Sequence, residues 1–293
     1  MRVLLTLCLL FTAVAAGSGE PREITWVLID WPPLYIVPPD GALEGPSSLG
    51  DGISDRASTL LAAKLPQYHH HFVRTDLQRL WGEIEHGHNL CYLSALRTPQ
   101  REKLAYFTPS FVLPPLNLVL RKDQANRISA TGQPVVLANL LNHAELKGAF
   151  ATKRSYSSEV DVLIDQAGNK TRRIAEPVSG RILRLIDAGQ LDYTLEYPIV
   201  VAYHQKLKPF EHELITLPLA EIPDILTANV ACTRNGWGKQ AIQDIDAALI
   251  ELSANEAFRN IVTPWLTADV VLRVRPRFEA FYNGRKQPLR LAD

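Results

Sequence analysis

The chain has 293 residues, of which 46% are hydrophobic and 21% are charged. This composition is typical of a globular protein and excludes an intrinsically disordered one. The 31 basic residues equal the 31 acidic ones, which argues against a nucleic-acid-binding protein, because such a protein carries a basic excess or patch. The length suits one large domain or two of ordinary size.

Residues 1–16 have the features of a secretory signal peptide. Arg2 precedes an apolar stretch that contains Cys8, and Ala13 to Ala16 supply the small residues of an A-x-A cleavage site. The apolar stretch is too short to span a bilayer. We therefore expect the chain to be exported to the periplasm and to lose this segment.

Two cysteines, Cys91 and Cys232, remain after that segment is removed. An exported protein reaches an oxidising compartment, in which two thiols can form a disulfide. Two buried free thiols, which pack like small hydrophobic residues, are the alternative. These observations by themselves leave both possibilities open.

Hydrophobic periodicity predicts alternating strands and helices at the start of the exported chain. The first strand ends at a Trp-Pro-Pro sequence, and Gly87 ends the second helix. The predicted order is strand 24–29, helix 53–65, strand 68–74, helix 77–87 and strand 89–96. This β-α-β-α-β order predicts a parallel sheet covered by helices.

A further strand leads into a second cycle of strands and helices. The predicted elements are strands 114–122, 147–153, 215–220 and 226–234, helices 157–166 and 179–189, a strand followed by a helix within 191–204, and one long helix over 237–262. Residues 269–293 are basic, and we expect an irregular tail there that could meet a partner or a membrane surface.

Four motifs follow one another along the chain: IDWPPLYI, LRTPQREKLAYFTPSF, LNLVLRK and RLIDAGQLDYTLEYPIVVAY. In these motifs and their order, the chain resembles the extracellular (periplasmic) solute-binding proteins of family 3, which are the amino-acid-binding type of ABC transporter substrate-binding proteins. The resemblance extends over residues 24–265, nearly the whole exported chain.

The resemblance implies an α/β, two-lobed, periplasmic-binding-protein-like type II fold, in which a ligand cleft lies between lobes joined by two crossing strands. Lobe 1 would comprise residues 22–120 plus 224–268, lobe 2 residues 121–223, and the tail residues 269–293. This division places Cys91 and Cys232 in the same lobe, which favours the disulfide.

The resemblance also assigns a role to the Thr-Pro-x-Arg turn. In similar proteins its arginine, here Arg101, pairs with the ligand's carboxylate, and a guanidinium matches a carboxylate with two parallel hydrogen bonds. Thr98 would cap a short helix that Pro99 begins, with its amide groups aimed at an anion. Ser94 would add a hydroxyl. The alternative for Arg101 is a structural ion pair or a solvated surface position.

The end of the first predicted strand carries Asp30, Trp31 and Tyr35. In open α/β sheets the carboxyl ends of parallel strands face the ligand crevice. An aromatic side chain at that position can stack on a ligand, and we expect these three residues to line the cleft. Ordinary packing beneath the Pro-Pro turn is the alternative.

In lobe 2, the resemblance implies that Arg154, Ser155, Tyr156 and Ser157 contact the ligand, although Ser157 can instead cap the following helix. The position at which similar proteins carry an ammonium-binding aspartate holds Tyr197 here, preceded by Glu196. If Glu196 faces away from the cleft, no partner for an ammonium group remains. This departure makes α-amino-acid binding uncertain, while a carboxylate ligand would still fit.

Five histidines lie close together in the sequence, at positions 69, 70, 71, 86 and 88. Alternating residues share a strand face, but no further ligand stands at a metal-binding spacing. No catalytic or nucleotide-binding motif is present, and we expect neither a cofactor nor a metal.

Together these observations predict a monomeric exported protein that captures a small polar or anionic solute, amino-acid-like or carboxylate-like, by lobe closure. It would serve an ABC transporter or a membrane sensor and would not be an enzyme. One alternative is an exported dehydratase-like enzyme with Glu196 or a histidine as general acid or base. Another is an interaction protein without a ligand.

Overall fold

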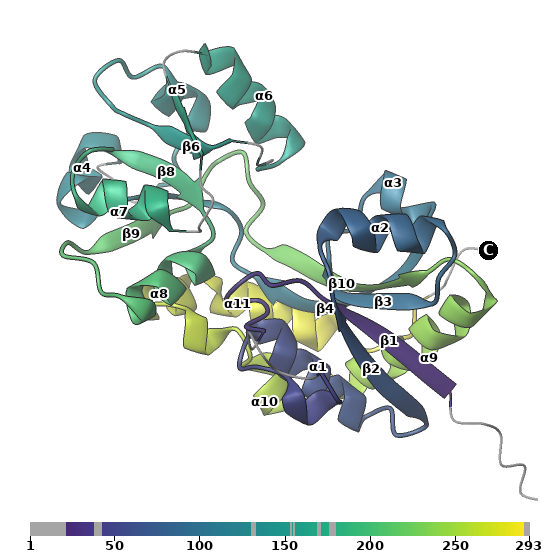
Figure 1. The fold of residues 1–293 in the computed structure, drawn as a ribbon. Helices are drawn as coiled ribbons and strands as arrows, with labels where there is room; N and C mark the ends of the chain where they lie inside the picture. Colours follow the sequence, from purple (N-terminus) through teal and green to yellow (C-terminus); the bar gives the residue numbers. More distant parts are fainter. Residues whose placement is uncertain are drawn as a thin grey trace, which may run out of the picture.

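The computed structural model describes residues 22–37, 43–129, 133–152, 154, 156–168, 171–175 and 180–289. The predicted signal peptide lies outside these residues. They form two lobes, each built around a β-sheet (Figure 1). Within the described part of the chain, no helix has both the length and the hydrophobicity needed to cross a membrane.

Lobe 1 contains a five-stranded sheet. Its strands lie in the order β2 (Tyr68–Arg74), β1 (Arg22–Leu28), β3 (Leu90–Ala95), β10 (Leu226–Thr233) and β4 (Ala105–Leu113). The predicted parallel arrangement holds for β1, β2 and β3, but β10 inserts antiparallel between β3 and β4. Strand β4 tolerates Pro109 because it lies at the edge of the sheet, where a missing N–H breaks no ladder.

The helices of lobe 1 cover this sheet. They are α1 (Ile53–Ala63), α2 (Leu77–Glu85), α3 (Pro99–Glu102), α9 (Gly236–Leu252) and α10 (Glu256–Arg259), with short 3-10 turns at Pro46–Ser48 and, as η4, at Thr263–Trp265. The single helix predicted over 237–262 is wrong in one respect, since α9 ends at Leu252. The side chain of Asn255 accepts a hydrogen bond from the Phe258 amide and so begins α10 as a separate helix.

Lobe 2 contains a smaller sheet. Strand β5 (Asn117–Arg121) pairs antiparallel with β8 (Tyr193–Glu196) and β9 (Leu214–Leu217), while β6 (Ala149–Ala151) pairs parallel with β7 (Arg172–Ile174). A bridge between Gly148 and Tyr193 joins the two groups of strands. A Cβ atom at Gly148 would lie 2.3 Å from the Tyr193 ring, so this position requires glycine.

Helices cover both faces of the lobe 2 sheet. They are α4 (Ala125–Ile128), α5 (Leu137–Leu141), α6 (Ser158–Ala167), α7 (Arg181–Asp187) and α8 (Pro198–Leu207), with a 3-10 turn at Lys122–Gln124. Alternation along β5 explains this arrangement. Leu118 and Leu120 pack with α5 and α6, whereas Val119 packs with Leu183 of α7 and Val201 of α8.

Two segments connect the lobes, residues 114–116 between β4 and β5 and residues 218–225 between β9 and β10. The predicted boundary at residue 120 falls inside β5, whose partners are all strands of lobe 2. The chain therefore leaves lobe 1 at the Pro114-Pro115 sequence, a few residues earlier than expected. Proline ends β4 there because it cannot donate to the ladder.

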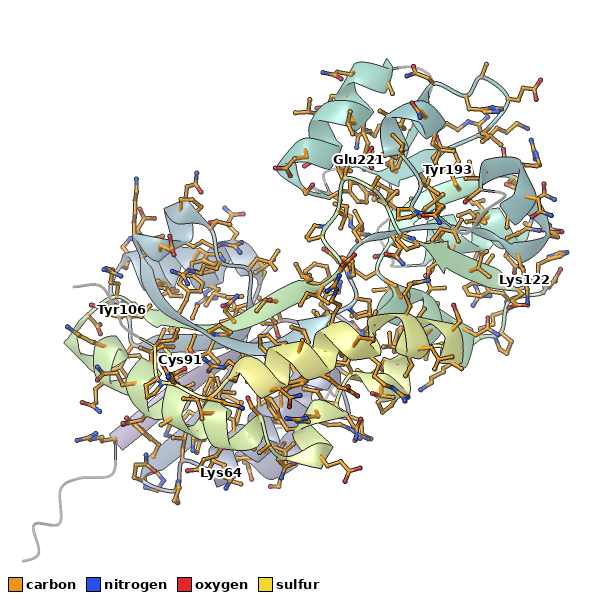
Figure 2. All side chains as sticks on the ribbon, turned by 180° about the vertical axis from the view of Figure 1, so that it is seen from behind. Lys64, Cys91, Tyr106, Lys122, Tyr193 and Glu221 are labelled. Atoms are coloured by element: carbon orange, nitrogen blue, oxygen red, sulfur yellow. A yellow bond between two sulfur atoms is a disulfide. The ribbon has the colours of Figure 1, made fainter. Side chains whose placement is uncertain are left out.

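The tail is not irregular as predicted, because Ala268–Gly284 forms helix α11. Its buried side chains Val270, Val274, Phe278 and Tyr282 recur every four residues, which is the pattern of one helix face. The arginines of the opposite faces and Pro276 obscured this pattern. Helix α11 runs across the back of both lobes (Figure 2). Residues 290–293 of the predicted tail lie outside the described residues.

Arginines of α11 and the arginine that follows it contact lobe 2, a connecting segment and lobe 1. Arg273 donates to the Thr216 carbonyl oxygen in β9 at 3.2 Å. Arg277 pairs with Asp224 in the second connecting segment, at 2.8 Å. Beyond the helix, Arg285 pairs with Asp246 of α9 at 2.7 Å in the interior of lobe 1.

Cys91 and Cys232 form a disulfide between neighbouring strands of lobe 1. They face one another in the antiparallel register of β3 and β10, and both are fully buried. The bond links two segments that are 141 residues apart in the sequence and so closes lobe 1 around the inserted second lobe. Figure 2 shows Cys91 in the interior of lobe 1.

Candidate functional site

A small cavity lies at the junction of the two lobes. Its volume is about 60 Å³, and its walls come from the loop after β1, from β3 and from the start of α8. None of the lining side chains is charged. They are Trp31, Pro32, Pro33, Leu34, Tyr92, Ser94, Leu96, Leu113, Tyr197, Ile199, Val200, Leu226 and Ala228. Three of them, Trp31, Ser94 and Tyr197, were predicted from the sequence, and the structure brings them together.

The wall formed by residues 31–36 is held in place by the first turn of α1. The amide of Ile53 donates to the Pro33 carbonyl at 2.8 Å, and the amide of Ser54 donates to the Leu34 carbonyl at 2.7 Å. These two amides belong to the group at a helix start that has no intrahelical partner. The loop carbonyls therefore provide hydrogen-bond acceptors for the free amides of the helix, and these bonds hold the loop in position.

Asp55 provides a second attachment for this wall. Its Oδ2 atom accepts hydrogen bonds from the Ile36 amide at 2.8 Å and from the Gly52 amide at 3.0 Å. Burial raises the pKa of Asp55 above its usual value, although these two hydrogen bonds partly oppose the shift. One turn of helix thus anchors residues 33–36 of the loop.

Two predicted residues of this loop do not line the cavity. Tyr35 is only 1% exposed and packs in the core of lobe 1, with its ring stacked on that of Tyr92 at 6.1 Å between centroids. Asp30 instead accepts a hydrogen bond from Arg74 at 2.6 Å on the surface. For Tyr35, the packing role is the one that the structure shows.

Arg101 lies in α3, beside the cavity. Its guanidinium carbon is 4.5 Å from the centroid of the Trp81 ring, and its Nη1 atom donates to the carbonyl oxygen of Leu96, a lining residue, at 3.0 Å. The side chain is half-buried, and the removal of water lowers the pKa of its guanidinium, an effect that the neighbouring Tyr92 opposes.

No carboxylate in the described part of the chain pairs with Arg101, whereas Arg97 in the same turn pairs with Glu102. Thr98 has the predicted capping role, since its Oγ1 atom accepts from the Arg101 amide at 3.3 Å. Ser94 shares a hydrogen bond with the hydroxyl of Ser54. The turn thus presents one half-buried cation for which the described residues supply no counter-charge.

On the lobe 2 side, Glu196 is bound by Arg154. The two guanidinium nitrogens donate to the two carboxylate oxygens at 2.5 and 2.7 Å, and the Tyr197 amide donates to Glu196 Oε1 at 2.8 Å. Burial would lower the pKa of Arg154, but the hydrogen bonds and charge of Glu196 outweigh it and raise the pKa above its usual value. Sequence reasoning did not predict this pairing.

The other predicted residues of lobe 2 have mainly structural roles. Tyr156 is 7% exposed, and its hydroxyl accepts a hydrogen bond from the Ala151 amide at 2.8 Å. Ser157 caps α6, because its Oγ atom accepts from the Val160 amide at 3.2 Å. Ser155 lies outside the described residues.

The histidines of β2 also have ordinary surroundings. Nδ1 of His70 accepts from the Trp26 indole at 2.9 Å, and Nε2 contacts the Leu65 carbonyl at 3.1 Å, which defines a neutral imidazole. His69 and His71 are exposed. Over the described residues, no cluster of three or more histidine, cysteine, aspartate or glutamate side chains could hold a metal ion.

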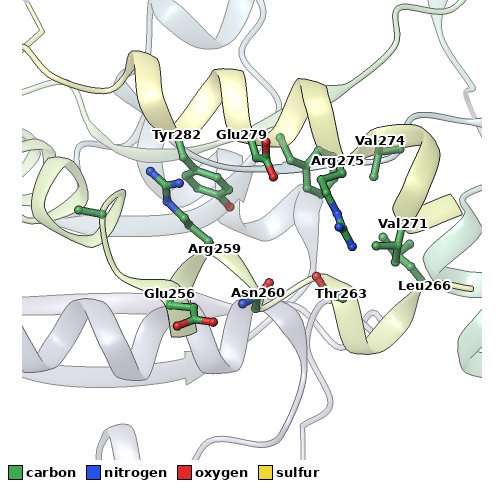
Figure 3. A pocket seen from close by; sticks show the side chains of 12 residues that line it. Glu256, Arg259, Asn260, Thr263, Leu266, Val271, Val274, Arg275, Glu279 and Tyr282 are labelled. Carbon is green, nitrogen blue, oxygen red and sulfur yellow. The ribbon is translucent and has the colours of Figure 1, made fainter. Parts of the chain in front are cut away.

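A larger hollow, of about 510 Å³, lies between α10, η4 and α11, away from every predicted site residue. Figure 3 shows Tyr282, Glu279 and Arg275 of α11 facing Glu256 across it. The Arg259 side chain at its rim donates to the Ser253 carbonyl and to Asn283. These bonds tie Arg259 to the fold, and we regard the hollow as a packing feature rather than the site.

Sequence reasoning missed several lining residues. Tyr92 is two residues before Ser94 on β3, so alternation along the strand could have placed both on the same face. Trp81 does not line the cavity, but its ring packs against the Arg101 guanidinium. No sequence pattern indicated this contact, because Trp81 lies in a different helix from Arg101.

No protein-family profile matches the sequence, and no curated protein matches it either. Solved structures do match. One is described as a probable amino-acid ABC transporter extracellular-binding protein from Bacillus subtilis, with 14% identity, 85% of this chain and 100% of that chain covered, and a TM-score of 0.64.

Two further structural matches are a solute receptor and a sensor domain. The L-cystine solute receptor of Neisseria gonorrhoeae, in an unliganded open conformation, is 17% identical and covers 84% of this chain and 93% of its own, with a TM-score of 0.58. A histidine kinase sensor domain similar to periplasmic binding proteins is 15% identical, with 84% and 96% covered and a TM-score of 0.57. At these identities the similarity concerns the fold. The chain has the two-lobed α/β fold of the periplasmic binding proteins.

Proposed function

We propose that the protein is an exported solute-binding protein that captures a small solute carrying a carboxylate in the cleft between its lobes, with Arg101 as the partner of that carboxylate. The observation that carries the proposal is the half-buried guanidinium of Arg101 beside the inter-lobe cavity, with no carboxylate partner among the described residues. A cation removed from water without a counter-charge favours an external anion.

Lobe closure would bring the ligand surfaces of both lobes together. Trp31 and Ser94 belong to lobe 1, and Tyr197 belongs to lobe 2, yet all three line one cavity. Two short connecting segments are the arrangement that hinge motion requires. The structural matches include transporter-associated binding proteins and a sensor domain, which supports delivery to an ABC transporter or to a membrane sensor. The predicted signal peptide supports a periplasmic location, and we expect a monomer.

We propose binding rather than catalysis. The structural matches named above are binding or sensor proteins. Glu196, the first candidate for a general acid or base, has both carboxylate oxygens occupied by Arg154. His70, a second candidate, is engaged through both ring nitrogens in lobe 1.

Thermal unfolding against a panel of small carboxylates, amino acids and neutral solutes tests this proposal. A ligand at a hundred times its Kd should add about 2.7 kcal/mol to the unfolding free energy, which raises Tm by roughly 5–10 °C for a chain of this size. Arg101→Ala should weaken binding by roughly tenfold to hundredfold. Arg97→Ala, four residues away, is the matched control and should leave the affinity unchanged. An absence of any shift across the panel would contradict the proposal.

A further inference from the structure

We infer that the cleft is specific for small monocarboxylic acids with an apolar body and without an ammonium group. This inference rests on the proposed function and specifies its ligand class. Three features carry it: the occupied carboxylate of Glu196, the uncharged cavity wall, and the guanidinium of Arg101, which has no carboxylate partner among the described residues.

The Glu196 carboxylate, which adjoins the cavity wall in lobe 2, is already paired with a cation. Glu196 immediately precedes the lining residue Tyr197 and accepts its amide hydrogen bond at 2.8 Å. Arg154 occupies both oxygens of Glu196, and the pair is largely removed from water, with side-chain exposures of 23% and 9%. An ammonium ligand would have to displace a bidentate guanidinium to reach this carboxylate, and that exchange is unfavourable.

Two other carboxylates lie near the cleft. Asp30 binds Arg74, and Oδ2 of Asp55 accepts two backbone amides, while Oδ1 of Asp55 is buried without a hydrogen-bond partner among the described residues. Neither residue lines the cavity. An ammonium group in this cavity would therefore lose its hydration without gaining an anionic partner. Removing a charged group from water in this way costs far more free energy than removing a neutral group.

The remaining wall suits an apolar body. Leu34, Leu113, Ile199, Val200 and Leu226 contribute aliphatic surface, and Trp31 adds an exposed aromatic face. Burial of each methylene group against such a wall contributes about 0.8 kcal/mol. Arg101 binds the carbonyl oxygen of Leu96, itself a lining residue, so the cation lies at the edge of this apolar surface.

Matched ligand pairs test the inference, because each pair differs only in the ammonium group. Isocaproate is compared with leucine, and hydrocinnamate with phenylalanine, by calorimetric titration and by Tm shift on protein exported from the full-length chain. Each acid should bind at least about tenfold more tightly than its amino acid. Arg101→Ala should reduce binding of the acids.

Two variants of the ion pair sharpen the test. Arg154→Leu releases Glu196, and the ratio of leucine to isocaproate affinity should rise by at least about tenfold. The double variant Arg154→Leu, Glu196→Gln removes both charges and should return the ratio to the wild-type value. If Arg154→Leu does not fold, the wild-type ratios and the double variant still decide the matter.

The possible failures are distinguishable. Equal or tighter binding of leucine and phenylalanine by the wild type would overturn the ligand class and leave the solute-binding function intact. Binding of only a different solute from the wider panel, lost in Arg101→Ala, would do the same. No binding of any solute would overturn both the ligand class and the proposed function.

Discussion

The two lobes are stabilised in different ways. Lobe 1 has one continuous hydrophobic core, which its five strands share with α1, α9 and α11 and into which Ile199 and Val200 of α8 also pack, and a buried disulfide lies inside it. Lobe 2 has three separate clusters, around Phe150, Ile186 and Val119. The comparison indicates that lobe 1 is a rigid platform and that lobe 2 unfolds more easily, since small cores with few strands have low local stability. Amide hydrogen exchange should therefore be faster in β5 and β8 than in β1 and β10.

Removal of the disulfide should have the largest effect on this difference. In the chain-entropy view, a crosslink that closes a 141-residue loop stabilises by about 5 kcal/mol. The Cys91→Ala, Cys232→Ala variant should therefore lose about that amount in denaturant unfolding, with the loss of exchange protection concentrated in β3 and β10. Lobe 2 strand β8 is the internal control. Equal loss of protection in both lobes would mean that the lobes do not unfold independently.

The second largest effect on stability should come from the buried ion pair between Asp246 and Arg285. Asp246 accepts hydrogen bonds from Arg285 at 2.7 Å and from Thr108 at 2.6 Å, with side-chain exposures of 5% for Asp246 and 9% for Arg285. Asp246→Ala leaves Arg285 buried and unpaired, and we expect a loss of about 3–5 kcal/mol in lobe 1. Arg277→Ala removes an exposed pair on the same helix and should cost less than about 1 kcal/mol. A similar loss of unfolding free energy in the two variants would show that burial of the ion pair does not determine its contribution.

A glycine substitution should affect lobe 2 alone. The Cβ of Gly148→Ala would approach the Tyr193 ring to 2.3 Å, and the resulting displacement should destabilise lobe 2 by about 1–3 kcal/mol. Gly82→Ala in α2 is the matched control, because nothing lies within 4 Å of its Cβ position and alanine favours a helix. That control should be neutral or slightly stabilising. Loss of lobe 1 exchange protection in Gly148→Ala would contradict the proposed independence.

The smallest expected effect is a dependence on pH. Burial lowers the pKa of His70 in lobe 1 and of His204 in lobe 2 below the usual 6.5. The unfolded chain therefore binds more protons below about pH 6.5, and stability falls as pH drops from there towards the folded-state pKa values, by at most about 1.4 kcal/mol per pH unit for each histidine. His70→Gln should reduce the dependence of lobe 1 stability on pH, whereas His69→Gln, at an exposed position, should leave it unchanged. An unchanged slope in His70→Gln would remove this residue from the account.

Local sequence signals predicted much of this fold but only part of the site. Residues 53–65 and 68–74 form a helix and a strand nearly as predicted, and Thr98 caps the turn that holds Arg101. Errors arose where tertiary contacts override local pattern. No element was predicted over Ala105–Leu113, where β4 accommodates Pro109 at the edge of the sheet, and an irregular tail was predicted where α11 contains Pro276 and an apolar stripe that the arginines obscure.

The alternation of strands and helices, the caps and the residue types near the cleft can be predicted from local residue order, because they depend on neighbours a few positions apart. Which side chains meet depends on the fold as a whole. Arg154 and Glu196 are 42 positions apart, and Cys91 and Cys232 are 141 apart. Such pairs depend on strand order and on the path of the chain between the lobes, so no local pattern could show that Glu196 is occupied while Arg101 has no counter-charge within the part of the chain that the structure describes.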